Sequence, residues 1–265
     1  MRFLYLIVSL LALPVAASDC ETFWQQQLDD YQAGRLELAA FIDSWRQQAE
    51  SCAGNGDYEL NLVRLLTSDG RFGEAAVIAK EASLLPGIAP GNKLNLLMAY
   101  LDNQYYLPAS VAGIEDPLYW AEALKPYRDL MAIGSASDLL FWRLIEMNFL
   151  AGSSTIAYEQ GLAYLGESSE GSYRAEVQRL LVRVCAALAK NGEAVYRFRQ
   201  LAAEDDAVWQ HADVVLSAVI AANHAHQRQQ AARWLQQGLE YNAAIAAHAL
   251  YPQAMAQVQP ASSSQ

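Results

Sequence analysis

The sequence predicts an all-α protein, an α-α superhelix of stacked helical hairpins. Apolar residues recur at intervals of three and four along most of the 265 residues, a spacing that places them on one face of a helix. Glycine or a short polar turn interrupts this spacing after each helix-length segment, which indicates paired helices. Hydrophobic residues make up 53% of the chain, which is enough to fill an extended core and excludes disorder of the whole.

The first seventeen residues have the three parts of a secretory signal peptide. Arg2 supplies the charged start, an apolar run extends over 3–13, and small residues follow at 16–18. We expect cleavage after Ala17. The run is shorter than the roughly 20 apolar residues that a membrane-spanning helix needs, so the mature chain is not expected to span a membrane. An uncleaved anchor is the alternative.

The compartment follows from the signal peptide and from a missing motif. The sequence contains no Asn-x-Ser/Thr triplet, which a chain glycosylated on export usually carries. We therefore expect a periplasmic protein, with secretion as the alternative. A lipid anchor on Cys20 is disfavoured, because Asp19 stands where such signals carry a small residue.

The acidic composition excludes some partners. The formal charge is −11, and removal of the signal peptide with Arg2 makes it one unit more negative. Such a surface disfavours binding to nucleic acid or to anionic membranes. We expect no cofactor and no metal: His224 and His226 lie two residues apart, do not share a helix face, and lack a third ligand.

The first element expected after the signal is a helical hairpin over residues 18–54. Helical spacing runs over 21–32 and 36–51, with a turn at 33–35. Because an antiparallel pair brings the start of its first helix beside the end of its second, we predict a disulfide between Cys20 and Cys52. In an oxidising compartment it would stabilise the hairpin by roughly 3–4 kcal/mol.

Residues 55–253 continue the pattern as a solenoid with an irregular insert at about 103–117. The clearest hairpin spans 58–86 and carries, in order, Leu62, Val63, Leu66, Gly70, Ala75, Ala79, Ala82 and Pro86. Later hairpins have their turns at Gly152, at 191–192 and at 226–228, and a helix over 118–131 is expected to break or bend at Pro126. Cys185 lies in an apolar pattern and is expected to be a buried, inert thiol. Residues 254–265 are expected to form a flexible tail.

These residues resemble the tetratricopeptide repeat (TPR), whose period is near the spacing of the hairpins. Gly70, Ala75, Ala82 and the proline at 86 stand where the family has such residues. The hairpin at 191–192 departs from the family by an arginine where alanine is preferred, and the hairpin at His226 lacks the turn glycine. A related α-α solenoid or an irregular helical bundle stays open as the alternative.

The resemblance implies that the first helix of each hairpin lines a concave groove. Counting back from the turns predicts these groove residues: Asn61, Arg64, Arg143, Glu146, Arg179, Arg183 and Asn223. Basic residues crowd into the hairpin over 174–199, which suggests a protein or peptide partner with acidic or carboxylate-ended groups, since arginine holds a carboxylate through two hydrogen bonds. The alternative is that these arginines form ordinary ion pairs with neighbouring glutamates.

The sequence contains no motif typical of an enzyme: no Gly-rich phosphate loop, no Gly-x-Ser-x-Gly and no His-Glu-x-x-His. We therefore expect a protein-binding adaptor or scaffold of an envelope assembly. Two alternatives stay open. One is an assembly chaperone for an exported polypeptide, and the other is a cell-wall hydrolase that uses Glu146.

Overall fold

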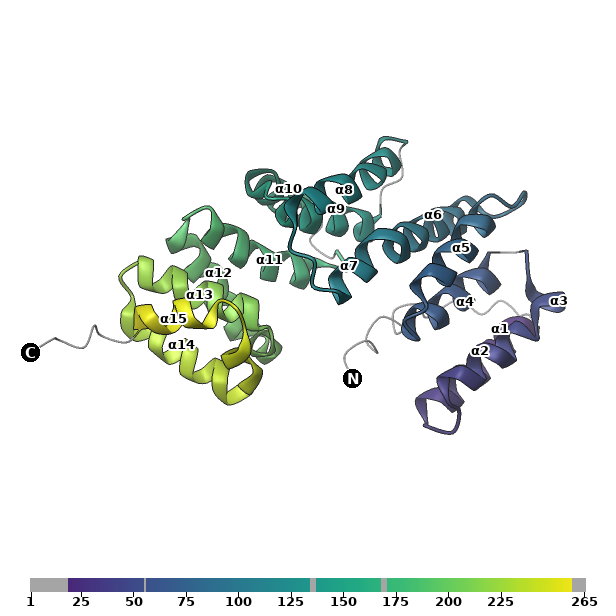
Figure 1. Ribbon diagram of the computed structural model, residues 1–265, viewed down its shortest axis with the longest axis horizontal. Helices are drawn as coiled ribbons and strands as arrows, with labels where there is room; N and C mark the ends of the chain where they lie inside the picture. The colour runs from purple at the N-terminus through teal and green to yellow at the C-terminus, as the bar shows by residue number, and fades with distance from the viewer. Residues whose placement is uncertain (1–18, 55, 134–136, 168–170, 259–265) are drawn as a thin grey trace, which may run out of the picture. The chain divides into compact units, whose positions relative to one another are not determined.

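The computed structural model describes residues 19–54, 56–133, 137–167 and 171–258, and all regular structure within these ranges is helical (Figure 1). This confirms the predicted all-α class. The predicted signal peptide, residues 1–17, lies outside the described residues. None of the helices in these ranges combines the length and the apolar character needed to cross a bilayer.

The chain divides into two compact units, Met1–Ile114 and Glu115–Gln265. The division falls inside the segment 103–117 that the sequence marks as irregular. The predicted hairpin over 18–54 belongs to the first unit, together with the helices up to 111. Each unit is described by itself below.

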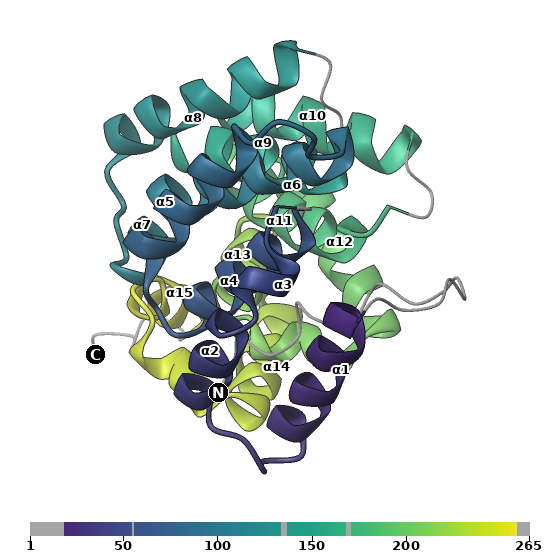
Figure 2. The ribbon, with the colours of Figure 1, turned by 90° about the vertical axis from the view of Figure 1, so that its right-hand side faces the viewer.

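The first unit begins with a disulfide-linked helical hairpin, which can be followed in Figure 2. The first helices of this unit are α1 (Asp19–Gln32), α2 (Leu38–Arg46), α3 (Ala49–Cys52), α4 (Asp57–Ser68), α5 (Phe72–Ser83) and α6 (Pro90–Leu101), and α1 pairs with α2 in the hairpin. The disulfide joins Cys20 to Cys52, as predicted. Trp45 of α2 packs against Trp24 of α1 and Tyr58 of α4, with ring centroids 4.9 and 5.3 Å away. Aromatic packing therefore joins the hairpin to the next helices.

The predicted insert at 103–117 is shorter than expected. The chain continues from α6 into a π-helical turn, η2 (Asp102–Tyr106), and then into α7 (Leu107–Val111). The amide of Leu107 donates to the carbonyl of Asp102, five residues back, which widens the helix just before Pro108. Because a wider turn accommodates a residue without a backbone donor, the proline does not end the helix there. Irregular structure is confined to 112–116.

The second unit contains paired helices that each pack on the next. They are α8 (Pro117–Ala132), α9 (Asp138–Leu150), α10 (Ser154–Glu167), α11 (Arg174–Ala187), α12 (Asn191–Glu204), η3 (Asp206–Gln210), α13 (Ala212–His224), α14 (Arg228–Tyr241), η4 (Ala243–Ala247) and α15 (Tyr251–Val258). Helix α8 runs unbroken through Pro126, which rules out the break but not the bend that the sequence allowed there. The predicted tail at 254–265 begins too early, because Ala254 is buried in α15; residues 259–265 lie outside the described part.

Hairpins of the second unit repeat every 37 residues. Gly152, Ala189 and His226 follow α9, α11 and α13 with φ of 78°, 55° and 60°. Five residues after each of them stands a fully buried alanine: Ala157, Ala194 and Ala231. The hairpin of α11 and α12 therefore turns at Ala189, and the predicted turn at 191–192 is wrong, because Gly192 already lies in α12.

The turn forms at Ala189, without a glycine, because backbone hydrogen bonds at the end of the helix determine its position. After α11 the amide of Lys190 donates to the carbonyl of Cys185, and after α13 the amide of Gln227 donates to the carbonyl of Ala222, each at 2.8 Å. These bonds close the helix ends with one residue in the left-handed conformation, which costs a non-glycine residue roughly 1 kcal/mol.

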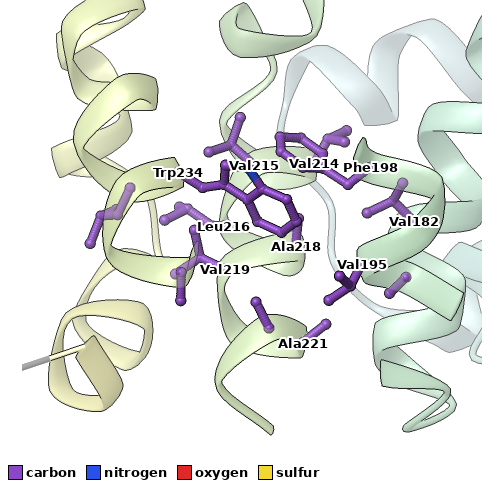
Figure 3. Close-up of a cluster of buried hydrophobic side chains, with 14 of the residues drawn as sticks. Val182, Val195, Phe198, Val214, Val215, Leu216, Ala218, Val219, Ala221 and Trp234 are labelled. Carbon is purple, nitrogen blue, oxygen red and sulfur yellow. The ribbon is translucent and has the colours of Figure 1, made fainter. Parts of the chain in front are cut away.

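The core of the second unit lies around α13 (Figure 3). Phe198 of α12 meets Trp234 of α14 edge to face, with ring centroids 4.7 Å apart, beside Val214 of α13. Cys185 is fully buried in the same core and has no disulfide partner. Burial raises the pKa of its thiol to about 11, so it stays protonated and unreactive near neutral pH, as expected from its apolar surroundings.

Candidate partner-binding surface

In the second unit, the first helices of consecutive hairpins lie next to each other. Helix α11 packs against α9 on one side and against α13 on the other, while α10, α12 and α14 are the second helices of these hairpins. We use the term first-helix surface for the side of α9, α11 and α13 that carries Glu146, Phe149, Arg179, Arg183 and Asp213.

Arg183 connects all three helices of this surface. Its Nη1 forms an ion pair with Oδ2 of Asp213 on α13 at 3.0 Å, and its guanidinium lies over the ring of Phe149 on α9, 5.0 Å from the centroid. An arginine stacked on a ring and paired with an acid has its guanidinium plane fixed in advance of any ligand. The side chain is still 26% exposed, so a ligand can reach it.

Arg179 lies one turn before Arg183 on the same face of α11. Its Nη2 donates to Oε1 of Glu176 at 3.2 Å, and its side chain is 18% exposed. Each of these two arginines therefore engages one carboxylate of the described chain, through one nitrogen. A guanidinium has five N–H donors, so most of the donors are left for other contacts.

Arg143 and Glu146 form a more enclosed pair on α9. Nη1 of Arg143 donates to Oε2 of Glu146 at 3.2 Å, and their side chains are 10% and 16% exposed. The carboxylate of Glu146, the proposed residue of a hydrolase, is thus held in an ion pair with its own helix neighbour.

Asn223 lies on α13 but at a different height from the other predicted residues. It precedes the turn residue His226 by three positions, whereas Glu146 and Arg183 precede Gly152 and Ala189 by six. Its Nδ2 donates to the carbonyl of Val219 at 3.3 Å. Sequence counting placed it too near the helix end because the turn at 226 has no glycine to mark it.

Asn61 and Arg64 belong to the first unit, on α4. Nη1 of Arg64 donates to Oδ1 of Asn61 at 3.0 Å. Desolvation lowers the pKa of Arg64, and the nearby Asp57 partly offsets this effect. The two residues form a local pair, and they are the part of the predicted groove that lies in this unit.

The remaining basic residues of the hairpin over 174–199 have other roles. Arg197 donates through Nε and Nη2 to Oε1 of Glu193 at 2.9 and 2.6 Å, and the hydroxyl of Tyr158 donates to Oε2 at 2.8 Å. Lys190 lies over the ring of Tyr158, 4.1 Å from its centroid. Burial of Glu193 raises its pKa, but the hydrogen bonds from Arg197 and Tyr158 outweigh this and lower it overall. The alternative of ion pairing with neighbouring glutamates therefore applies to Arg197 with Glu193, and also to Arg179 with Glu176.

Sequence reasoning missed Phe149 and Asp213, which complete the surroundings of Arg183. The sequence pattern makes Phe149 one of several apolar positions of its helix and gives no signal that singles out Asp213. Only the packing of α11 between α9 and α13 brings them to one arginine. No group of three potential metal ligands occurs among the residues that the structure describes.

Helices stacked as hairpins with first helices side by side define an all-α helical solenoid of the TPR-like class. A solved structure similar to this chain is the crystal structure of YrrB, described as a TPR protein with an unusual peptide-binding site. The match has a TM-score of 0.54 at 15% identity and covers 81% of this chain and 99% of that chain, so it shows the fold alone. No protein-family model matches the sequence, and no curated protein matches it.

Proposed function

We propose that the protein is a periplasmic protein-binding scaffold of an envelope assembly, which binds a partner segment on the first-helix surface. The observation that supports this most directly is the pair of part-exposed arginines on α11, Arg179 and Arg183, held between α9 and α13. Helical solenoids use such stacked surfaces to bind extended segments.

The chemistry of the two arginines favours a partner with acidic or carboxylate-ended groups. Each guanidinium has N–H donors beyond the one that its internal acid accepts, and Phe149 offers a ring face beside Arg183. A carboxylate held by charge-assisted hydrogen bonds in this partly enclosed place gains more than it would in open solvent. Because Glu176 and Asp213 already pair with these arginines, a carboxylate of the partner would share the guanidinium groups with them or replace them.

The periplasmic location is supported by the amino-terminal signal pattern and by the disulfide between Cys20 and Cys52. Structural disulfides persist in oxidising compartments. The description of YrrB as having a peptide-binding site supports a peptide partner for this chain by analogy of fold.

Affinity capture from the native envelope, with crosslinking and mass spectrometry, tests the proposal. We expect one dominant companion, and we expect the double variant Arg179→Ala with Arg183→Ala to lose it without a large change in melting temperature. The matched control is Arg199→Ala with Arg233→Ala, which removes two exposed arginines from α12 and α14 and should leave capture intact. Equal capture by both double variants would exclude this surface.

The same experiment separates the two alternatives. A chaperone would bring down many unfolded exported chains, each weakly. A cell-wall hydrolase would release products from purified peptidoglycan and would lose this turnover in Glu146→Gln. The ion pair of Glu146 with Arg143 gives no support to that role.

A further inference from the structure

The carboxyl-terminal end of the second unit contains an apolar depression of about 400 Å³ between α14 and α15. It is lined by Ala232, Leu235, Gln236, Leu239, Glu240, Tyr251 and Met255. It lies apart from the first-helix surface, since its walls are a second helix and the last helix of the described chain.

Helix α15 occupies the position of a first helix in one more hairpin. It follows α14 through η4 as α13 follows α12 through η3. Asp205 and Asn242, 37 residues apart, begin these two short helices, and each accepts a hydrogen bond from the amide two residues later, at 2.8 and 3.1 Å. Helix α15 also packs against α13, as α13 packs against α11.

The surface that forms the depression is covered in the hairpin before it. Moving back by 37 residues, the half-buried Ala232, Tyr251 and Met255 correspond to Val195, Val214 and Ala218, which are 0–3% exposed in the core that includes Trp234 of α14. In the described chain no second helix follows α15. The depression therefore lies where the second helix of a further hairpin would pack.

Residues 259–265 do not offer a suitable helix. Residues 259–265 read Gln-Pro-Ala-Ser-Ser-Ser-Gln and contain no large apolar side chain. A second copy stacked end to end is disfavoured by charge. The depression on α1 of the first unit is lined by Glu21, Asp29 and Asp30 with a single basic residue, Arg35, and the acidic rim residue here is Glu240.

We propose that this depression binds an amphipathic α-helix of a partner protein, basic towards the end that lies beside Glu240. Its apolar stripe would resemble that of α14, in which Ala231, Trp234 and Leu235 are buried and Gly238 allows close approach to Val215. Charge complementarity favours a basic helix, because Glu240 is exposed at the rim and the whole chain carries a net charge of −11.

The test uses a fluorescent peptide with the sequence of residues 228–241 carrying Glu240→Lys, titrated with the full-length exported protein and followed by anisotropy. We expect micromolar binding, and at least tenfold weaker binding of the same peptide with Trp234→Gln and Leu235→Gln. In the protein, Leu239→Asp should weaken binding at least tenfold. Glu240→Lys should weaken it roughly threefold, as loss of an exposed ion pair does.

The matched control for the charge change is Glu159→Lys, an exposed acid on α10 away from the depression, which should leave binding unchanged. Because Leu239→Asp places a charge at a half-buried position of α14, circular dichroism checks its fold, and Glu240→Lys on the exposed rim provides the independent measurement. Absence of peptide binding, or equal binding by all variants, would overturn the proposal. If the protein sediments as a dimer and Leu239→Asp makes it a monomer, the depression binds a second copy. If the peptide binds more tightly after removal of residues 259–265, that segment occupies the depression. Either result would overturn the proposal.

Discussion

The disulfide between Cys20 and Cys52 should supply much of the stability of the first hairpin. Among the residues of α1 only Leu28 is buried, although Phe23 and Trp24 pack partly against α2. The two cysteines are 32 residues apart. On the chain-entropy model, a crosslink across a loop of that length removes about 3.7 kcal/mol of conformational freedom from the unfolded chain. We expect Cys20→Ser with Cys52→Ser to lower the free energy of unfolding of this hairpin by about 3–4 kcal/mol.

The assay combines urea denaturation, followed by tryptophan fluorescence, with hydrogen exchange resolved by mass spectrometry. Exchange should accelerate most in α1, because few buried contacts hold this helix once the crosslink is gone. The control is Cys185→Ala, which leaves the disulfide intact, removes one buried sulfur from the second unit and should leave exchange in α1 unchanged. A change below about 1 kcal/mol, with α1 still protected, would refute the view that the crosslink stabilises the hairpin.

Three further predictions concern the second unit. Ala189→Gly should stabilise it by about 1 kcal/mol and Gly152→Ala should destabilise it by a similar amount, because both positions have positive φ; paired urea melts test the opposite signs. Gly238→Ala should cost about 1 kcal/mol net, since a Cβ there would lie 2.8 Å from a buried valine, whereas Gly166→Ala, with open space around it, should stabilise by up to about 1 kcal/mol in thermal melts. The pKa of Glu193 is lower in the folded protein than its unfolded value of 4.5, so its ionised carboxylate stabilises the fold above that value, and this stabilisation is lost as pH falls through the folded pKa. The difference in the free energy of unfolding between wild type and Glu193→Gln should therefore shrink in acid. A difference that grows in acid would contradict the stabilising contacts from Arg197 and Tyr158.

Features of the fold that depend on local chemistry could be predicted from the sequence. The disulfide followed from two helical segments of similar length with a cysteine at each outer end. The turns at Gly70 and Gly152 followed from glycine itself, because that residue adopts positive φ without steric cost.

Features that depend on hydrogen bonding rather than residue type could not be predicted in the same way. At Ala189 and His226 the hydrogen bonds that end the helix impose positive φ on residue types that rarely adopt it, so the sequence gives no sign of the turn. Because a glycine stands at 192, three residues after Ala189, the sequence analysis placed the turn there and shifted the register of the hairpin formed by α11 and α12. With the turn at Ala189, the residue that corresponds to Glu146 is Arg183, while Arg179 lies one turn earlier.

The basic cluster shows how one stretch of sequence can serve two structural purposes. Arg179 and Arg183 lie on a first helix, where α9 and α13 approach, and they keep part of their surface exposed. Lys190 and Arg197 lie after the turn and interact with Tyr158 and Glu193 between α10 and α12.

A count of charges along the chain cannot separate these groups, because the separation arises from the reversal of direction at Ala189. Arg179 and Arg183, before the turn, lie on the first-helix surface, whereas Lys190 and Arg197, after it, take part in the packing of second helices. Only the first group can exchange an internal carboxylate for that of a partner without disturbing the interior. For this reason the variants that test partner binding should be confined to α11, whereas changes at Arg197 or Glu193 should alter stability and pH dependence before they alter binding.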